Sequence, residues 1–138
     1  MGLLKKLNHR GPDSTGNKLI IDSNKTVLML HTRLKITGND SVQPIVNRDN
    51  TVYLVINGEI FNFKSLKKDL ESKGIEFKTT GDTEVLLQLY IYYGEKCLEM
   101  LNGFFALAIA VLAKTPSQPN SIAIADKINE YISAFDTE

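Results

Sequence analysis

The residue pair in this sequence that could do chemistry is Asn57-Gly58, which follows the apolar segment 51–56. Asn-Gly tolerates positive backbone dihedral angles and leaves its amide groups facing outward. A side-chain amide and a backbone N–H presented together at a strand end can form an oxyanion hole, which stabilises negative charge on a reacting carbonyl. Asn-Gly is also the commonest hairpin turn signal. The pair by itself therefore leaves a reactive site and a plain turn both open.

The elements that would position this pair alternate between strands and helices. Branched and aromatic residues and turn signals predict strands at 18–22, 26–30, 51–56, 75–78, 103–113 and 121–125, the first two forming a hairpin and the last two separated by a turn at 116–120. Helices are predicted at 2–7, at 63–73, from Asp82 onward, and at 95–101. Strands flanked by helices indicate an α+β layered domain.

Two of the predicted helices begin at side chains that could cap them. Asn62 precedes the helix at 63–73, and Gly74 follows that helix. Asp82 opens the next helix. An apolar face is predicted on this second helix, formed by Val85, Leu86, Leu89, Tyr90 and Tyr93.

Composition excludes several classes of function. The chain has 138 residues, which suits one domain, and its 16 basic and 16 acidic residues cancel, so no nucleic-acid or anionic-membrane footprint is expected. The longest apolar run, 104–113, is far below the roughly 20 residues that span a bilayer. One cysteine and two isolated histidines, His9 and His31, predict no metal site, and no cofactor is expected. We expect a cytoplasmic protein.

Three further motifs accompany Asn57-Gly58-Glu59-Ile60-Phe61-Asn62. They are His9-Arg10-Gly11-Pro12-Asp13-Ser14, His31-Thr32-Arg33-Leu34 with Gln43-Pro44 after it, and Asp82-Thr83-Glu84. The set resembles the glutaminase domain of class II glutamine amidotransferases, most closely that of glutamine-dependent asparagine synthetase, and covers about residues 3–112. The resemblance implies a four-layer αββα sandwich of the N-terminal-nucleophile hydrolase type. It also implies that glutamine is the substrate, with its side-chain amide supplying ammonia.

The same resemblance implies roles for five residues. Arg33 matches the arginine that holds the glutamine α-carboxylate, and a guanidinium suits this because it binds two carboxylate oxygens at once. Asn57 and Gly58 match the oxyanion hole, through a side-chain amide and a backbone N–H. Glu59 and Asp82 match the acidic groups that receive the α-ammonium. The alternatives are a surface salt bridge for Arg33, a turn for Asn57-Gly58 and a helix cap for Asp82.

The sequence departs from the family pattern at both ends. Family members begin with a cysteine that attacks the amide, whereas the only cysteine here is Cys97, which we interpret as a packed apolar residue rather than a nucleophile. After about residue 113 little of the pattern remains. We expect one glutaminase-like domain over 1–138, truncated at its N-terminus, as a partial αββα sandwich. The lost first strand would leave an unpaired sheet edge.

Three interpretations of the function stay open. The chain is a fragment of a working asparagine-synthetase-like amidotransferase, a catalytically inactive remnant that binds glutamine or another protein, or an enzyme of another mechanism on this scaffold. Negligible glutaminase activity is expected, because an oxyanion hole without its nucleophile retains only a small residual effect. Expected partners are glutamine and either an ATP-dependent synthetase domain or a second copy of the chain. The motif at 9–13 receives no chemical role.

Overall fold

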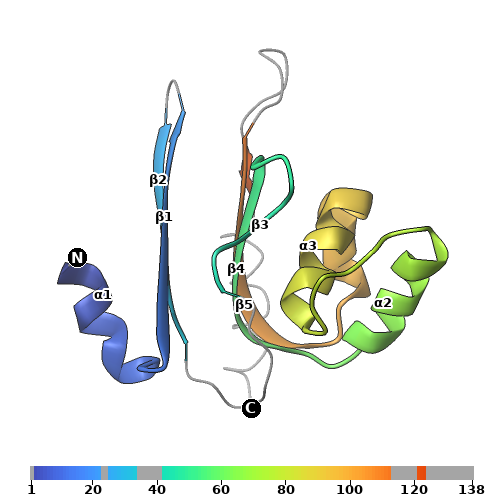
Figure 1. The fold of residues 1–138 in the computed structure, drawn as a ribbon, viewed down its shortest axis with the longest axis horizontal. Helices are drawn as coiled ribbons and strands as arrows, with labels where there is room; N and C mark the ends of the chain where they lie inside the picture. Colours follow the sequence, from blue (N-terminus) through green and yellow to red (C-terminus); the bar gives the residue numbers. More distant parts are fainter. Residues whose placement is uncertain (1, 23–24, 34–41, 113–120, 124–138) are drawn as a thin grey trace, which may run out of the picture.

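The computed structural model describes residues 2–22, 25–33, 42–112 and 121–123 (Figure 1). Its elements in chain order are α1 (Gly2–Leu7), a 3₁₀ helix (Asn8–Arg10), β1 (Ser14–Asp22), β2 (Lys25–Arg33), β3 (Ile45–Val46), β4 (Val52–Ile60), α2 (Phe63–Ser72), α3 (Asp82–Tyr93), a second 3₁₀ helix (Gly94–Met100), β5 (Gly103–Val111) and β6 (Ser121–Ala123).

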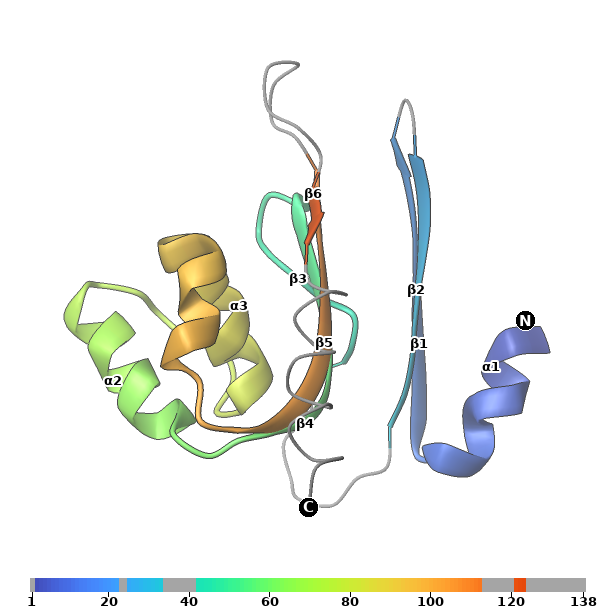
Figure 2. The same ribbon diagram turned by 180° about the vertical axis from the view of Figure 1, so that it is seen from behind.

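These elements form layers, which Figures 1 and 2 show from opposite sides. Helices α2 and α3 cover one face of a four-stranded sheet with the order β3-β4-β5-β6, and the two-stranded sheet β1-β2 lies against the other face. Helix α1 lies outside β1-β2 and buries none of its residues. The order is therefore helix, sheet, sheet, helix, which confirms the α+β class and the expected partial sandwich.

Strand pairing is antiparallel throughout the described sheets. The β1-β2 ladder runs from Ser14↔Arg33 to Asp22↔Lys25, and β4 and β5 pair over nine positions from Val52↔Val111 to Ile60↔Gly103. Strands β2 and β4 lie in different sheets but run in the same direction (Figure 1). Their C-terminal ends therefore come to the same end of the molecule.

Alternation along β4 separates two cores. Even-numbered positions such as Leu54 and Ile56 enter a cluster with the helices, whereas Tyr53 and Val55 face β1-β2. The side chains of the first cluster that are less than 2% exposed are Leu54, Ile60, Leu70, Val85, Leu86, Leu89, Cys97 and Ile109. Tyr53 joins the smaller cluster between the sheets, whose other buried members are Ile20, Met29 and Ala110.

Strands β1 and β2 extend beyond their predicted ends, to Ser14 and Arg33, and β3 was not predicted. Three further differences concern β4, the segment 75–78 and the residues before β5. Strand β4 continues to Ile60 instead of ending at residue 56, so Asn57-Gly58 lies inside a strand and the turn alternative is wrong. The predicted strand at 75–78 is absent, because the Lys78 N–H donates to the carboxylate of Glu84 rather than to a neighbouring strand. The helix expected at 95–101 is a 3₁₀ helix. The predicted turn at 116–120 lies outside the described residues.

Asn62 occupies the N-cap position of α2, but its side chain does not cap the helix. Its amide nitrogen donates to the carbonyl of Met100 and its amide oxygen accepts the Asn102 N–H, both at 2.9 Å. The side chain therefore joins the end of β4 to the start of β5 rather than satisfying the first turn of α2.

We expect Asn62→Ser to lower the free energy of unfolding by about 1–2 kcal/mol, because serine cannot replace both hydrogen bonds. Urea denaturation would measure the change, with Asn17→Ser, exposed on β1, as the control. Serine is as good a helix cap as asparagine. An unchanged stability would therefore mean that Asn62 acts as a cap after all.

Candidate functional site

One edge of β4 carries the site, because β3 pairs only with Tyr53 and Leu54 there. Beyond Leu54, side chains form hydrogen bonds with backbone groups of β4 that β3 leaves unpaired. The Ile56 N–H donates to Gln43 Oε1 at 2.7 Å, and the Ile56 carbonyl lies 3.2 Å from His31 Nε2. Along this edge, β3 therefore pairs with Tyr53 and Leu54, and the side chains of Gln43 and His31 bind the backbone of Ile56.

Asp82 occupies the same edge beyond Ile56. Its Oδ2 accepts the Ile60 N–H at 3.1 Å. Asp82 is the first residue of α3, follows the N-cap Gly81 and makes no side-chain cap, so its predicted capping role is wrong. The carboxylate instead joins the start of α3 to the end of β4.

Gly58 lies on this edge between the two satisfied positions. In an antiparallel ladder, alternate residues direct N–H and C=O to the same side. The N–H of Gly58 therefore points the same way as those of Ile56 and Ile60, away from β5. Within the part of the chain that the structure describes, this N–H has no hydrogen-bond partner, and Gly58 is exposed. It is a backbone donor available to a ligand.

The backbone of Gly58 requires glycine. Its φ is +130°, and a Cβ at this position would lie 2.2 Å from the Phe104 carbonyl oxygen. Gly103 is constrained by lack of space alone, with a Cβ position 2.1 Å from the carbonyl oxygen of Glu59. The two glycines let β4 and β5 approach closely beside the site.

Asn57 and Glu59 lie on the face of β4 that carries Val55. Ile60 shares the helix-side core with Ile56, so the alternation continues unbroken through Gly58. Asn57 and Glu59 are both exposed. Their side chains therefore face the layer that contains β2.

Arg33 is brought to the same region by His31. His31 reaches the carbonyl of Ile56 from β2, and Arg33 is the next residue on that face of β2, as Gly58 is the next on that edge of β4. Because the two strands run in the same direction (Figure 1), Arg33 and Gly58 each lie two residues beyond the contact between His31 and Ile56, toward the same end of the molecule. Arg33 is half-buried.

Burial lowers the pKa of His31, and nearby Arg33 lowers it further, although the hydrogen bond to Ile56 acts in the opposite direction. His31 is therefore neutral at pH 7. Since the Ile56 carbonyl can only accept, the proton of the imidazole lies on Nε2.

Glu84 organises the segment that leads to Asp82. Only 6% of Glu84 is exposed, and its carboxylate accepts the N–H of Lys78 at 2.9 Å and both the N–H and the hydroxyl of Thr79 at 2.6 Å. Burial raises the pKa of Glu84, but these hydrogen bonds outweigh it and the pKa is lowered. Glu84 remains ionised and holds the loop against α3.

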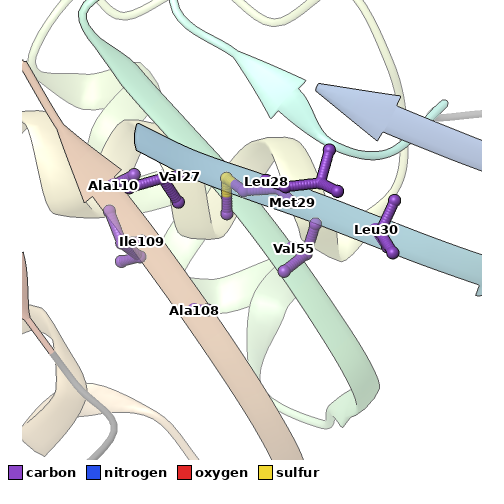
Figure 3. A pocket seen from close by; sticks show the side chains of 8 residues that line it. All are labelled: Val27, Leu28, Met29, Leu30, Val55, Ala108, Ile109 and Ala110. Atoms are coloured by element: carbon purple, nitrogen blue, oxygen red, sulfur yellow. The ribbon is translucent and has the colours of Figure 1, made fainter. Parts of the chain in front are cut away.

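A cavity of about 250 Å³ lies between the sheets, and its lining does not include Arg33, Gly58 or Asp82 (Figure 3). Its lining is apolar and comes from β2, β4 and β5: Val27, Leu28, Met29, Leu30, Val55, Ala108, Ile109 and Ala110. Such a lining offers no charged partner to a carboxylate or an ammonium group. The cavity is therefore not the place where these groups would bind.

Other chemistry finds little support in the described residues. Cys97 is fully buried in the core, and burial raises the pKa of its thiol to about 11, so it is a packed residue and not a thiolate nucleophile. No group of three histidine, cysteine, aspartate or glutamate residues that could hold a metal occurs in these segments. None of the described helices has the length and apolar character needed to cross a membrane.

Comparison with known proteins assigns the chain. Residues 1–116 match the glutamine amidotransferase domain. The chain belongs to this family. It is 43% identical over 105 residues to a probable glutamine-hydrolysing asparagine synthetase of Schizosaccharomyces pombe, covering 75% of this chain and 18% of that protein. It is 39% identical over 112 residues to a glutamine-hydrolysing asparagine synthetase of Bacillus subtilis, covering 78% and 17%.

A solved structure agrees with this assignment. The glutamine phosphoribosylpyrophosphate amidotransferase of B. subtilis, complexed with ADP and GMP, superposes with a TM-score of 0.62 at 28% identity, covering 78% of this chain and 31% of that one. The present chain is thus an asparagine-synthetase-like class II glutamine amidotransferase domain with the N-terminal-nucleophile hydrolase fold. It spans less than a fifth of the length of the asparagine synthetases it matches.

For three residues that support the candidate site, the sequence did not predict this role. Gln43 and His31 belong to motifs that the sequence singled out, but nothing in their spacing shows that both bind the peptide groups of Ile56. Glu84 follows Asp82 by two positions and looks like an ordinary acidic residue in a first helical turn. Its burial was the missing signal.

Proposed function

We propose that this amidotransferase domain binds L-glutamine at the edge of β4, so that its side-chain amide can supply ammonia. The observation that carries the proposal is the exposed Gly58 N–H, which lacks a partner among the described residues and lies between the satisfied positions Ile56 and Ile60. A carbonyl oxygen of the ligand would accept from this N–H and from the Asn57 side-chain amide.

The charged ends of glutamine would meet complementary groups. Asp82 uses one carboxylate oxygen for the Ile60 N–H, and we propose that its other oxygen receives the α-ammonium together with Glu59. Arg33, at the end of β2, would bind the α-carboxylate. This arrangement selects an amino acid over a simple amide because both of its charges are recognised.

These 138 residues contain the groups proposed to bind glutamine, but their cysteine is not placed to hydrolyse it. The only cysteine, Cys97, is buried in the core on the far side of the four-stranded sheet from β2, so it cannot attack an amide held by Asn57. We propose that this stretch alone binds glutamine without hydrolysing it. We propose further that the acceptor of the ammonia would be a synthetase domain of the kind that its relatives' names indicate.

We expect calorimetry to detect L-glutamine binding in the millimolar range, and Asp82→Asn to weaken it at least about tenfold, or 1.4 kcal/mol. Asparagine keeps an oxygen that can accept the Ile60 N–H, so the fold is retained while the charge is lost. Asp49→Asn, in an exposed turn, is the control. Absence of binding by the unaltered chain would remove the proposal, and ammonia release abolished by Arg33→Ala would overturn its non-hydrolytic part.

A further inference from the structure

The loop that carries the motif His9-Arg10-Gly11-Pro12-Asp13 lies against the main chain of Arg33. Gly11 is buried, and a Cβ on it would lie 2.5 Å from the backbone nitrogen of Arg33 and 2.5 Å from the carbonyl carbon of Thr32. No side chain fits in that space. Glycine at position 11 is what allows the loop to touch this strand end.

The next two residues bind the same strand end. Pro12 forms an isolated parallel bridge with Arg33, and the Asp13 N–H donates to the Arg33 carbonyl at 3.0 Å. Arg33 is the last residue of β2, where a strand has fewer neighbours to hold it in place. Together with the Ser14↔Arg33 pair of the β1-β2 ladder, the loop therefore holds the main chain at Arg33 in place.

We propose that Gly11, Pro12 and Asp13 are positioning residues that set the direction of the Arg33 side chain and so determine recognition of the α-carboxylate. The inference rests on the proposed role of Arg33 in glutamine binding and assigns a role to a motif that the substrate contacts leave unused. The loop reaches Arg33 through its backbone, by the contacts of Gly11, Pro12 and the Asp13 N–H. Loosening it therefore weakens the hold on the carboxylate and leaves the contacts to the ammonium and side-chain amide in place.

The test compares two ligands on the whole chain: L-glutamine and L-glutamine α-amide, which has no α-carboxylate. In Gly11→Ala the dissociation constant for glutamine should rise about tenfold, whereas that for the α-amide should stay within about twofold. The matched control is Gly2→Ala, because a Cβ on Gly2 meets nothing within 4 Å. Equal weakening of both ligands, or of neither, overturns the inference.

A milder variant and a second measurement distinguish a loss of positioning from unfolding of the Gly11→Ala variant. Pro12→Gly introduces no clash and only frees the loop, so glutamine binding should weaken about threefold with the α-amide again unaffected. Hydrogen exchange at the Asp13 amide, which donates to Arg33, should accelerate at least about tenfold in both variants. If the unaltered chain binds neither ligand, the proposed function fails. Unchanged exchange at Asp13 overturns the loop's positioning role by itself.

Discussion

Replacing Gly58 with alanine is expected to lower the free energy of unfolding by about 3–5 kcal/mol, measured by urea denaturation. Two effects add. The φ of +130° disfavours any residue with a Cβ, and that Cβ would lie 2.2 Å from the Phe104 carbonyl oxygen and 2.6 Å from the Phe105 Cα. Both neighbours are backbone atoms of the paired strand, so they cannot move aside without breaking the β4-β5 ladder.

Gly74→Ala separates these two effects. Gly74 also has a positive φ, +84°, but a Cβ there would meet nothing within 4 Å. We expect a loss of about 1 kcal/mol for this variant, from the backbone conformation alone. Equal losses at the two positions would mean that the close approach of β4 and β5 contributes nothing.

Glu84→Gln is expected to have the second largest effect, a loss of about 2–3 kcal/mol at pH 7. The carboxylate accepts hydrogen bonds from three donor groups, and hydrogen bonds to a charged group contribute more than neutral ones. A glutamine of the same size keeps one acceptor oxygen and presents an NH₂ group to the remaining donors. Because the loop ends at Asp82, weaker glutamine binding should accompany the loss.

The effect of Glu84 should depend on pH with a defined sign. Its folded pKa is lowered from the ordinary value of 4.5, so the unfolded chain binds the proton more readily. The stabilisation is fully present above about pH 4.5 and declines as the pH falls through the folded pKa. The difference between the unaltered chain and Glu84→Gln should therefore shrink in acid.

Chemical denaturation between pH 3 and pH 7 would measure this dependence. Glu76→Gln, an exposed glutamate on the same loop, is the control and should stay within about 0.5 kcal/mol of the unaltered chain. A difference for Glu84→Gln that is constant across this range would contradict the assignment of the carboxylate.

Apolar periodicity predicted well which side chains are buried, whereas the layered sandwich was expected from the family resemblance. The faces of α3 and the alternation of β4 are direct consequences of which side chains enter the core, and Val85, Leu86 and Leu89 are buried as expected. Prediction from the sequence was wrong where hydrogen bonds determined the local structure. The segment 75–78 has the apolar residues of a strand, yet its backbone binds Glu84. Asn62 has the type and place of a cap, yet it binds 40 residues away at Asn102.

The candidate site was likewise predicted in part. Motif resemblance drew attention to Arg33, Asn57, Gly58 and Asp82, and the fold brings Gly58 and Asp82 to one strand edge. Extension of β4 through Asn57-Gly58 could not be foreseen, because Asn-Gly normally interrupts a strand. At the end of β4 the close pairing also depends on Gly103 of the partner strand, which lies opposite Ile60 and whose relevance only the pairing reveals.

Ile56 also limits how the two sheets can move. His31 from the two-stranded sheet and Gln43 from outside both sheets bind the carbonyl and the N–H of this one residue. Sliding β2 along β4 by two residues, about 6–7 Å, would remove His31 from its acceptor altogether. The contact of His31 with Ile56 therefore opposes sliding of β2 along β4, and it does so two residues away from both Arg33 and Gly58.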